Sequence, residues 1–211
     1  MKRIILSEGK NDTIFLKELL TKKLAIDESK ILFFDQNSQS IKKNLKFLED
    51  RYFERLDSEW MPYNLLVKSE GGKTKIVDIT LSKLVPLCQK GYNPIMLIDL
   101  DNGLMTSFIN KFREKLTSRF KSIRLTIESR ELHRIDDAVM HSISLFKNAD
   151  TPDLIGTIYI IGFCRTLEHV TGIGQFIYTD EQKKSMFQAY IKRSQIHEMF
   201  NEALDIPTLL M

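Results

Sequence analysis

Cysteine is scarce in this sequence. Its 211 residues include only Cys88 and Cys164, which form no Cys-x-x-Cys pair and have no metal-binding spacing. Two cysteines cannot hold together a chain of this length, so a disulfide-stabilised secreted scaffold is excluded. We therefore expect a protein of the reducing cytoplasm.

Long apolar runs are also lacking. The longest run, residues 154–164, has about half of the roughly 20 residues that cross a bilayer, and Arg165 follows it directly. The run Ile4-Ile5-Leu6 near the start is too short for the core of a signal peptide. We therefore expect no membrane span and no membrane partner, and we expect the chain to start with the first strand of its fold.

Neither sign of charge dominates the whole chain. It has 31 basic and 28 acidic residues, and the net charge of +3 favours an anionic partner only slightly. Between residues 111 and 130, however, only Glu114 and Glu128 are acidic. The basic residues of this stretch are Lys111, Arg113, Lys115, Arg119, Lys121, Arg124 and Arg130. Such a stretch is typical of a solvated helix face, and also of a surface that contacts nucleic-acid phosphates.

Apolar strands alternate with amphipathic helices over most of the sequence. We predict strands at residues 4–6, 31–34, 65–67, 95–98, 122–128 and 157–161. The predicted helices cover residues 14–20, 41–56, 76–87, 108–116, 138–145 and 186–204. Parallel neighbours need helical crossovers, and unbroken apolar strands are typical of sheets buried on both faces. The sequence thus predicts an α/β fold with a mostly parallel sheet flanked by helices.

Acidic residues follow two of the predicted strands. Glu8 follows the first strand, and Asp99 and Asp101 follow the strand at residues 95–98. If these strands are neighbours, the carboxylates converge at one edge of the sheet, where a cation would relieve their mutual repulsion. Carboxylate oxygens are the ligands that Mg²⁺ prefers, and Asp12 is a further candidate. Each acid can instead be a helix-capping or solvated turn residue, and both interpretations remain open.

These residues match a family pattern. The segment Ile4 to Asp12, with its Glu8-Gly9 pair, followed by Ile95 to Asp101, with its Asp-x-Asp, resembles the Toprim domain of topoisomerases, bacterial primases and OLD-family nucleases. The resemblance covers about residues 1–130 and implies a Rossmann-like Toprim fold. It implies that Asp99 and Asp101 hold Mg²⁺, or Mn²⁺ in its place, for chemistry on phosphodiester bonds. Glu8 would act as general acid/base or as a further metal ligand.

Glycine-bearing turns supply the predicted phosphate-binding residues. Gly9 allows the backbone to approach a ligand closely, and Lys10 follows it. The turn Gly71-Gly72-Lys73 is similar to the glycine-bearing turn of stand-alone and OLD-type Toprim proteins, with Lys73 placed to pair with a phosphate. A turn of this composition is more often only a turn. Arg130, Glu131 and Glu168, which follow the strands at residues 122–128 and 157–161, are possible additional site groups.

The sequence departs from the compact Toprim pattern in two places. Residues 27–60 form an insertion, predicted to be helical, and residues 131–211 lie beyond the family core. We expect residues 131–211 to form an α/β elaboration packed on the same sheet as residues 1–130. No topoisomerase tyrosine can be carried over, so the resemblance supports a metal site better than it supports any one reaction.

Three functions remain open from the sequence. The first is a Mg²⁺-dependent enzyme that acts on phosphodiester bonds of DNA or RNA. The second is a binding or regulatory module that works with a protein partner or as a homo-oligomer. The third is a phosphatase of the haloacid dehalogenase type, which Asp99-Leu100-Asp101 and the later pair Asp136-Asp137 also resemble. Against the third, Gly103 stands where that family has Thr or Val.

Overall fold

The computed structural model describes residues 2–34, 64–89, 91–121, 125–147, 153–174 and 177–206. In chain order its elements are β1 (Lys2–Ser7), α1 (Lys10–Glu18), the π-helical turn η1 (Leu19–Lys23), the 3₁₀ turn η2 (Glu28–Lys30), β2 (Ile31–Phe34), β3 (Leu65–Ser69), α3 (Lys73–Gln89), β4 (Tyr92–Asp99), α4 (Met105–Arg119), β5 (Leu125–Arg134), β6 (Ala138–Lys147), β7 (Asp153–Phe163), α5 (Leu167–Thr171), α6 (Asp180–Arg193) and α7 (Ile196–Leu204). No helix within these ranges is long and apolar enough to cross a membrane.

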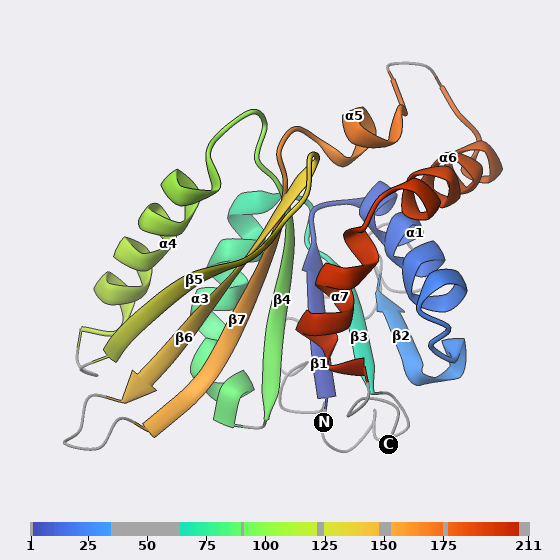
Figure 1. Cartoon of the computed structure of the whole chain (residues 1–211). Helices are drawn as coiled ribbons and strands as arrows, with labels where there is room; N and C mark the ends of the chain where they lie inside the picture. The colour runs from blue at the N-terminus through green and yellow to red at the C-terminus, as the bar shows by residue number, and fades with distance from the viewer. Residues whose placement is uncertain are drawn as a thin grey trace.

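A seven-stranded sheet forms the centre of the molecule, with the order β2-β3-β1-β4-β7-β6-β5 (Figure 1). The strands β2, β3, β1, β4 and β7 run parallel, whereas β6 is antiparallel to both β7 and β5. This arrangement confirms the predicted α/β class and the mostly parallel sheet. Because β7 lies between β4 and β6, a late segment of the chain pairs directly with the strand that ends in Asp99.

Helices cover both faces of the sheet. Apolar side chains of α3 and α4 pack on one face, and those of α1, α5, α6 and α7 pack on the other. Alternate residues of β1 point to opposite faces of the sheet. Ile4 and Leu6 pack on the side of α3 and α4, and Ile5 packs on the side of α1, α5, α6 and α7. Strand β1 also contacts the end of α7, because Arg3 Nε donates to the carbonyl of Leu204, 3.2 Å away.

Most of the predicted elements are confirmed, and the exceptions lie after residue 130. The helix predicted at 138–145 is wrong, because these residues belong to β6, which pairs with β5 and β7 on its two sides. Its apolar residues are buried on both faces of the strand, and such a short run shows no period that separates strand from helix. The expected boundary at residue 130 falls inside β5.

Two further predictions are modified or remain open. The single helix predicted at 186–204 is two helices, α6 and α7, because the backbone at Ser194 is extended. Within the predicted insertion at 27–60, residues 27–34 include η2 and the edge strand β2. The predicted helix at 41–56 and Arg124 lie outside the described residues.

Gly156 marks a close approach between β7 and α3. A Cβ atom at this position would lie 2.4 Å from Sγ of Cys88 and 2.8 Å from its Cβ. We expect Gly156→Ala to lower the free energy of unfolding by about 1 to 3 kcal/mol, measured by urea denaturation, because this core has no room to expand. Introducing Cys88→Ala as well should recover part of the loss. An equal cost with and without Cys88→Ala would contradict this account.

Candidate functional site

The carboxyl ends of β1 and β4 lie side by side. The two strands pair in parallel, with Leu6 opposite Met96, so Glu8 after β1 and Asp99 at the end of β4 reach the same edge. Oε1 of Glu8 accepts a hydrogen bond from the backbone N–H of Asp99 at 2.9 Å. The convergence expected from the sequence for Glu8 and Asp99 is therefore present.

Asp99 connects this edge to the segment after β7. Its Oδ1 accepts a hydrogen bond from the backbone N–H of Leu167, the first residue of α5, at 2.9 Å. Burial raises the pKa of Asp99 to about 7, although the bond from Leu167 lowers it. The charges of the neighbouring carboxylates Glu8, Glu168 and Asp101 also contribute to this raised pKa. Asp99 is thus a partly buried acid among other acids.

Asp12 lies in the first turn of α1 and is buried. Its Oδ2 accepts a hydrogen bond from the backbone N–H of Gly9 at 2.7 Å, a contact that stabilises the start of the helix. Burial, together with the charges of Asp99, Glu168 and Glu8, raises the pKa of Asp12 to about 8, against the lowering effect of the Gly9 N–H. Asp12 therefore has the helix-capping role that the sequence left open. It also lies close enough to Asp99, Glu168 and Glu8 for their charges to raise its pKa.

Glu8 has a raised pKa for the same main reason. Burial favours its protonated form, while the backbone N–H of Asp99 and the charge of Lys73 favour the ionised form. The charge of Asp101 raises the pKa. The pKa values of Glu8, Asp12 and Asp99 are thus all raised at this edge, mainly by burial and in addition by the neighbouring carboxylates.

Asp101 occupies a tight turn beyond β4. Asp101 and Asn102 both have positive φ, 52° and 64°, and the N–H of Gly103 donates to the carbonyl of Leu100 at 2.7 Å. This conformation is tolerated by Asp and Asn more readily than by other side chains that carry a Cβ. The turn exposes Asp101, whose Oδ2 accepts from Nζ of Lys73 at 2.7 Å. Asp101 therefore lies at the solvent side of the group.

The predicted phosphate-binding residues separate in the structure. Lys73 is the first residue of α3 and contacts the carboxylates at this edge through its ion pair with Asp101. The turn before Lys73 has positive φ at Gly71 and Gly72. Gly9 uses its N–H to bind Asp12. Lys10 instead forms an ion pair with Asp180 of α6, at 2.9 Å, where both side chains are about half exposed.

Glu168 joins the acids although sequence reasoning gave it little weight. Its Oε1 accepts from Nδ2 of Asn11 at 2.8 Å, and Oδ1 of Asn11 accepts from Nζ of Lys183 at 3.0 Å. Its charge raises the pKa values of Asp12 and Asp99. The position of Glu168 after a strand was the available signal. The sequence does not show that β7 pairs with β4, and this pairing brings Glu168 to the sheet edge that carries Asp99.

The donor set of this edge fits a hard divalent cation, because the side chains gathered here supply mainly carboxylate oxygens. Among the described residues, no three His, Cys, Asp or Glu side chains are grouped so as to hold a metal ion. One oxygen each of Glu8, Asp12 and Asp99 accepts from a backbone N–H group, and Oδ2 of Asp101 accepts from Lys73.

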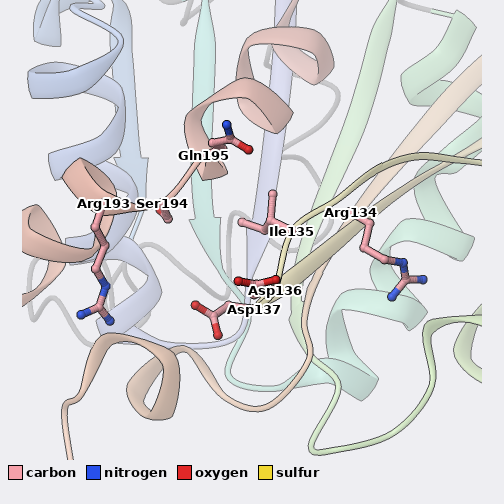
Figure 2. Close-up of a pocket in the computed structure, with 7 residues that line it drawn as sticks. All are labelled: Arg134, Ile135, Asp136, Asp137, Arg193, Ser194 and Gln195. Atoms are coloured by element: carbon pink, nitrogen blue, oxygen red, sulfur yellow. The ribbon is translucent and has the colours of Figure 1, made fainter.

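The later acidic pair, Asp136 and Asp137, lies in the turn between β5 and β6. Figure 2 shows both side chains facing the junction of α6 and α7 across a pocket of about 540 Å³. The pocket is lined by Arg134, Ile135, Asp136, Asp137, Arg193, Ser194 and Gln195. It shares no lining residue with the carboxylate group around Asp99, so it adds no support to the phosphatase interpretation.

The shifted pKa of Asp12 predicts a pH-dependent stability in metal-free buffer. Its pKa rises from an ordinary 3.8 to about 8 on folding, so the unfolded chain ionises first and stability falls as pH increases from about 4 to 8. Asp12→Asn should remove about 1 to 3 kcal/mol of this fall, measured by urea denaturation at several pH values. Asp136→Asn, an exposed control, should leave the slope unchanged. A wild-type slope in Asp12→Asn would contradict the assignment.

Comparison with known proteins adds no family to this description. Neither a scan against protein-family models nor a search of curated proteins finds a match to this chain.

Proposed function

We propose that this protein is a Toprim-like, Mg²⁺-dependent enzyme that acts on phosphodiester bonds of nucleic acid. The observation that carries the proposal is the hydrogen bond from the Asp99 N–H to Glu8, which joins the two halves of the Toprim-like signature at one sheet edge. Asp12, Asp101 and Glu168 add further carboxylates. An acidic edge of this kind is suited to a cation and, through the cation, to a phosphate.

Each residue has a distinct task under this proposal. Asp99 and Asp101 would hold Mg²⁺, assisted by Glu8 and Asp12, and Mn²⁺ has the same ligand preference. The bound cation would neutralise charge that develops on the attacked phosphate. Glu8, whose burial raises its pKa above the ordinary value, would hold and release the proton. Lys73 is placed to contact the phosphate once it leaves Asp101.

A second candidate function is a non-catalytic or partner-dependent nucleic-acid-binding module. The observation that favours it is the engagement of Glu8, Asp12 and Asp99 by backbone N–H groups, which leaves them as structural acceptors in the isolated chain. In that case a protein partner, or a second copy of the chain, would be needed to release them.

One experiment separates the two candidates. The protein is incubated with single-stranded DNA, double-stranded DNA and RNA, in Mg²⁺, in Mn²⁺ and in EDTA, and Mg²⁺ binding is measured by calorimetry. The enzyme proposal expects cleavage that requires the cation, and micromolar-to-millimolar cation binding. Cation binding without cleavage would favour the binding module. Cleavage that is equal in EDTA would overturn the metal-dependent assignment.

A further inference from the structure

The outward face of α4 carries its basic side chains in two rows. Lys111, Lys115 and Arg119 recur every four residues, and Arg113 and Lys121 form a second row that ends just beyond the helix. All five are exposed, while the apolar side chains of α4 face the sheet. Residues four apart lie one above another, so Lys111, Lys115 and Arg119 form a line of charge along the helix, about 12 Å long. We call this surface the α4 ridge.

Two pockets flank the α4 ridge, and their polar residues are of the kinds that contact phosphates. One pocket, of about 640 Å³, lies between α3 and α4. It is lined by Asp78, Ile79, Leu81, Ser82, Lys115, Ser118 and Arg119. The other, of about 590 Å³, is lined by Asn110, Arg113, Glu114, Thr117, Ser118 and Lys121. Hydroxyl, amide and basic side chains together are the usual partners of phosphate oxygens in protein–DNA contacts.

Within the described ranges, few acidic side chains lie close to the basic side chains of the α4 ridge. Of the acids that line the pockets, Asp78 approaches Lys115 only to 4.0 Å, with both side chains more than half exposed, and Glu114 is exposed. The chain as a whole is close to neutral, so five basic side chains against two acids is a local concentration. Figure 1 shows α4 leading away from the loop that follows β4, where Asp101 lies.

We propose that the α4 ridge holds the phosphate backbone of a nucleic-acid duplex and leads it toward the carboxylate edge. The inference rests on the proposed function only in assigning phosphodiester chemistry to the carboxylate edge. Binding along the ridge needs basic side chains alone, and a row of about 12 Å matches three to four base pairs at about 3.4 Å each.

The described part of α4 carries no exposed aromatic ring, and this favours a duplex over a single strand at the ridge. Proteins that hold single strands stack the bases on exposed aromatic side chains. On α4, Phe112 is buried and Phe108 is stacked on it, with ring centroids 6.2 Å apart. The large hydrophobic side chains that are exposed within the described ranges are Leu104, Leu154 and Ile177, none of them aromatic.

The test measures duplex binding in EDTA, which separates the ridge from metal chemistry. Fluorescence anisotropy of the full chain with a short DNA or RNA duplex gives Kd from about 50 to 200 mM salt. We expect Lys111→Ala/Lys115→Ala/Arg119→Ala to raise Kd at least about tenfold and to reduce the slope of log K against log salt by about 2 to 3. Comparing the two duplexes shows whether DNA or RNA is preferred.

Matched variants make the outcome specific. Lys22→Ala/Lys23→Ala/Lys192→Ala removes the same charge from exposed positions of η1 and α6 and should leave Kd within about twofold. Three outcomes would each overturn the proposal that the ridge binds a duplex. They are unchanged affinity and salt slope in the α4 variant, no duplex binding by the wild type, and equally tight binding of a single strand. Duplex binding through the ridge without metal-dependent cleavage would instead overturn only the proposed enzyme.

Discussion

Asp99→Asn is expected to lower metal-dependent cleavage at least about 100-fold, to the background measured in EDTA. The substitution keeps the shape of the side chain and an oxygen that can accept from Leu167, but it removes the negative charge. Mg²⁺ affinity, measured by calorimetry, should fall with the rate. Glu8→Gln should also lower the rate, with a smaller loss of Mg²⁺ affinity, because under the proposed function this residue handles the proton.

Stability measurements distinguish this result from misfolding. Burial and neighbouring carboxylates raise the pKa of Asp99 to about 7, so a neutral side chain at this position should leave unfolding at pH 8 unchanged or stabilise the fold. Asp136→Asn, in the turn between β5 and β6, is the matched control and should retain full activity. Wild-type cleavage by Asp99→Asn would remove this residue from the proposed site.

Phe15→Ala should be among the most destabilising single substitutions, lowering the free energy of unfolding by about 3 to 5 kcal/mol. Phe15 is fully buried between α1, the sheet and α6. Its ring lies 5.8 Å from that of Phe163 in β7 and 5.7 Å from that of Phe187 in α6, both nearly edge to face. Its loss would leave a cavity that joins three segments far apart in the chain.

Equilibrium urea denaturation, followed by circular dichroism, measures this effect. Phe108→Ala is the matched control, because Phe108 is only partly buried on the outer layer, and its loss should cost clearly less. Asp12 precedes Phe15 by about one helical turn, so the weakened packing should also loosen the carboxylate edge and reduce Mg²⁺ affinity. A cost of Phe15→Ala no larger than that of Phe108→Ala would contradict this account of the core.

The parts of the fold that the sequence predicted are those fixed by local patterns. Strands β1 and β4 are short apolar runs ended by polar turns, and both were placed correctly, as were α3 and α4. Glu8 and Asp99 could be expected to meet because each directly follows such a run, and parallel neighbours align their ends. These inferences need only a few adjacent residues and one assumption about strand order.

The rest depends on pairings between distant segments. The order that puts β7 beside β4 cannot be read from either strand, yet it decides that Leu167 donates to Asp99 and that Glu168 joins the acids. Strand β6 was mistaken for a helix because burial on both faces removes the alternation that identifies a strand. The ion pair of Lys10 with Asp180 likewise depends on the packing of α6 against α1.

The insertion of β7 between β4 and β6 has a consequence for folding. Until residues 153–163 are available, one edge of β4 has no strand to pair with, and Asp99 lacks its amide partner from α5. The bond between Arg3 and Leu204 closes a loop of 201 residues, so early and late segments must assemble together. Contacts of such high sequence separation slow folding and expose unpaired strand edges in intermediates. The carboxylate edge should therefore form late in folding, after the nucleation of the elements that contribute its first acids.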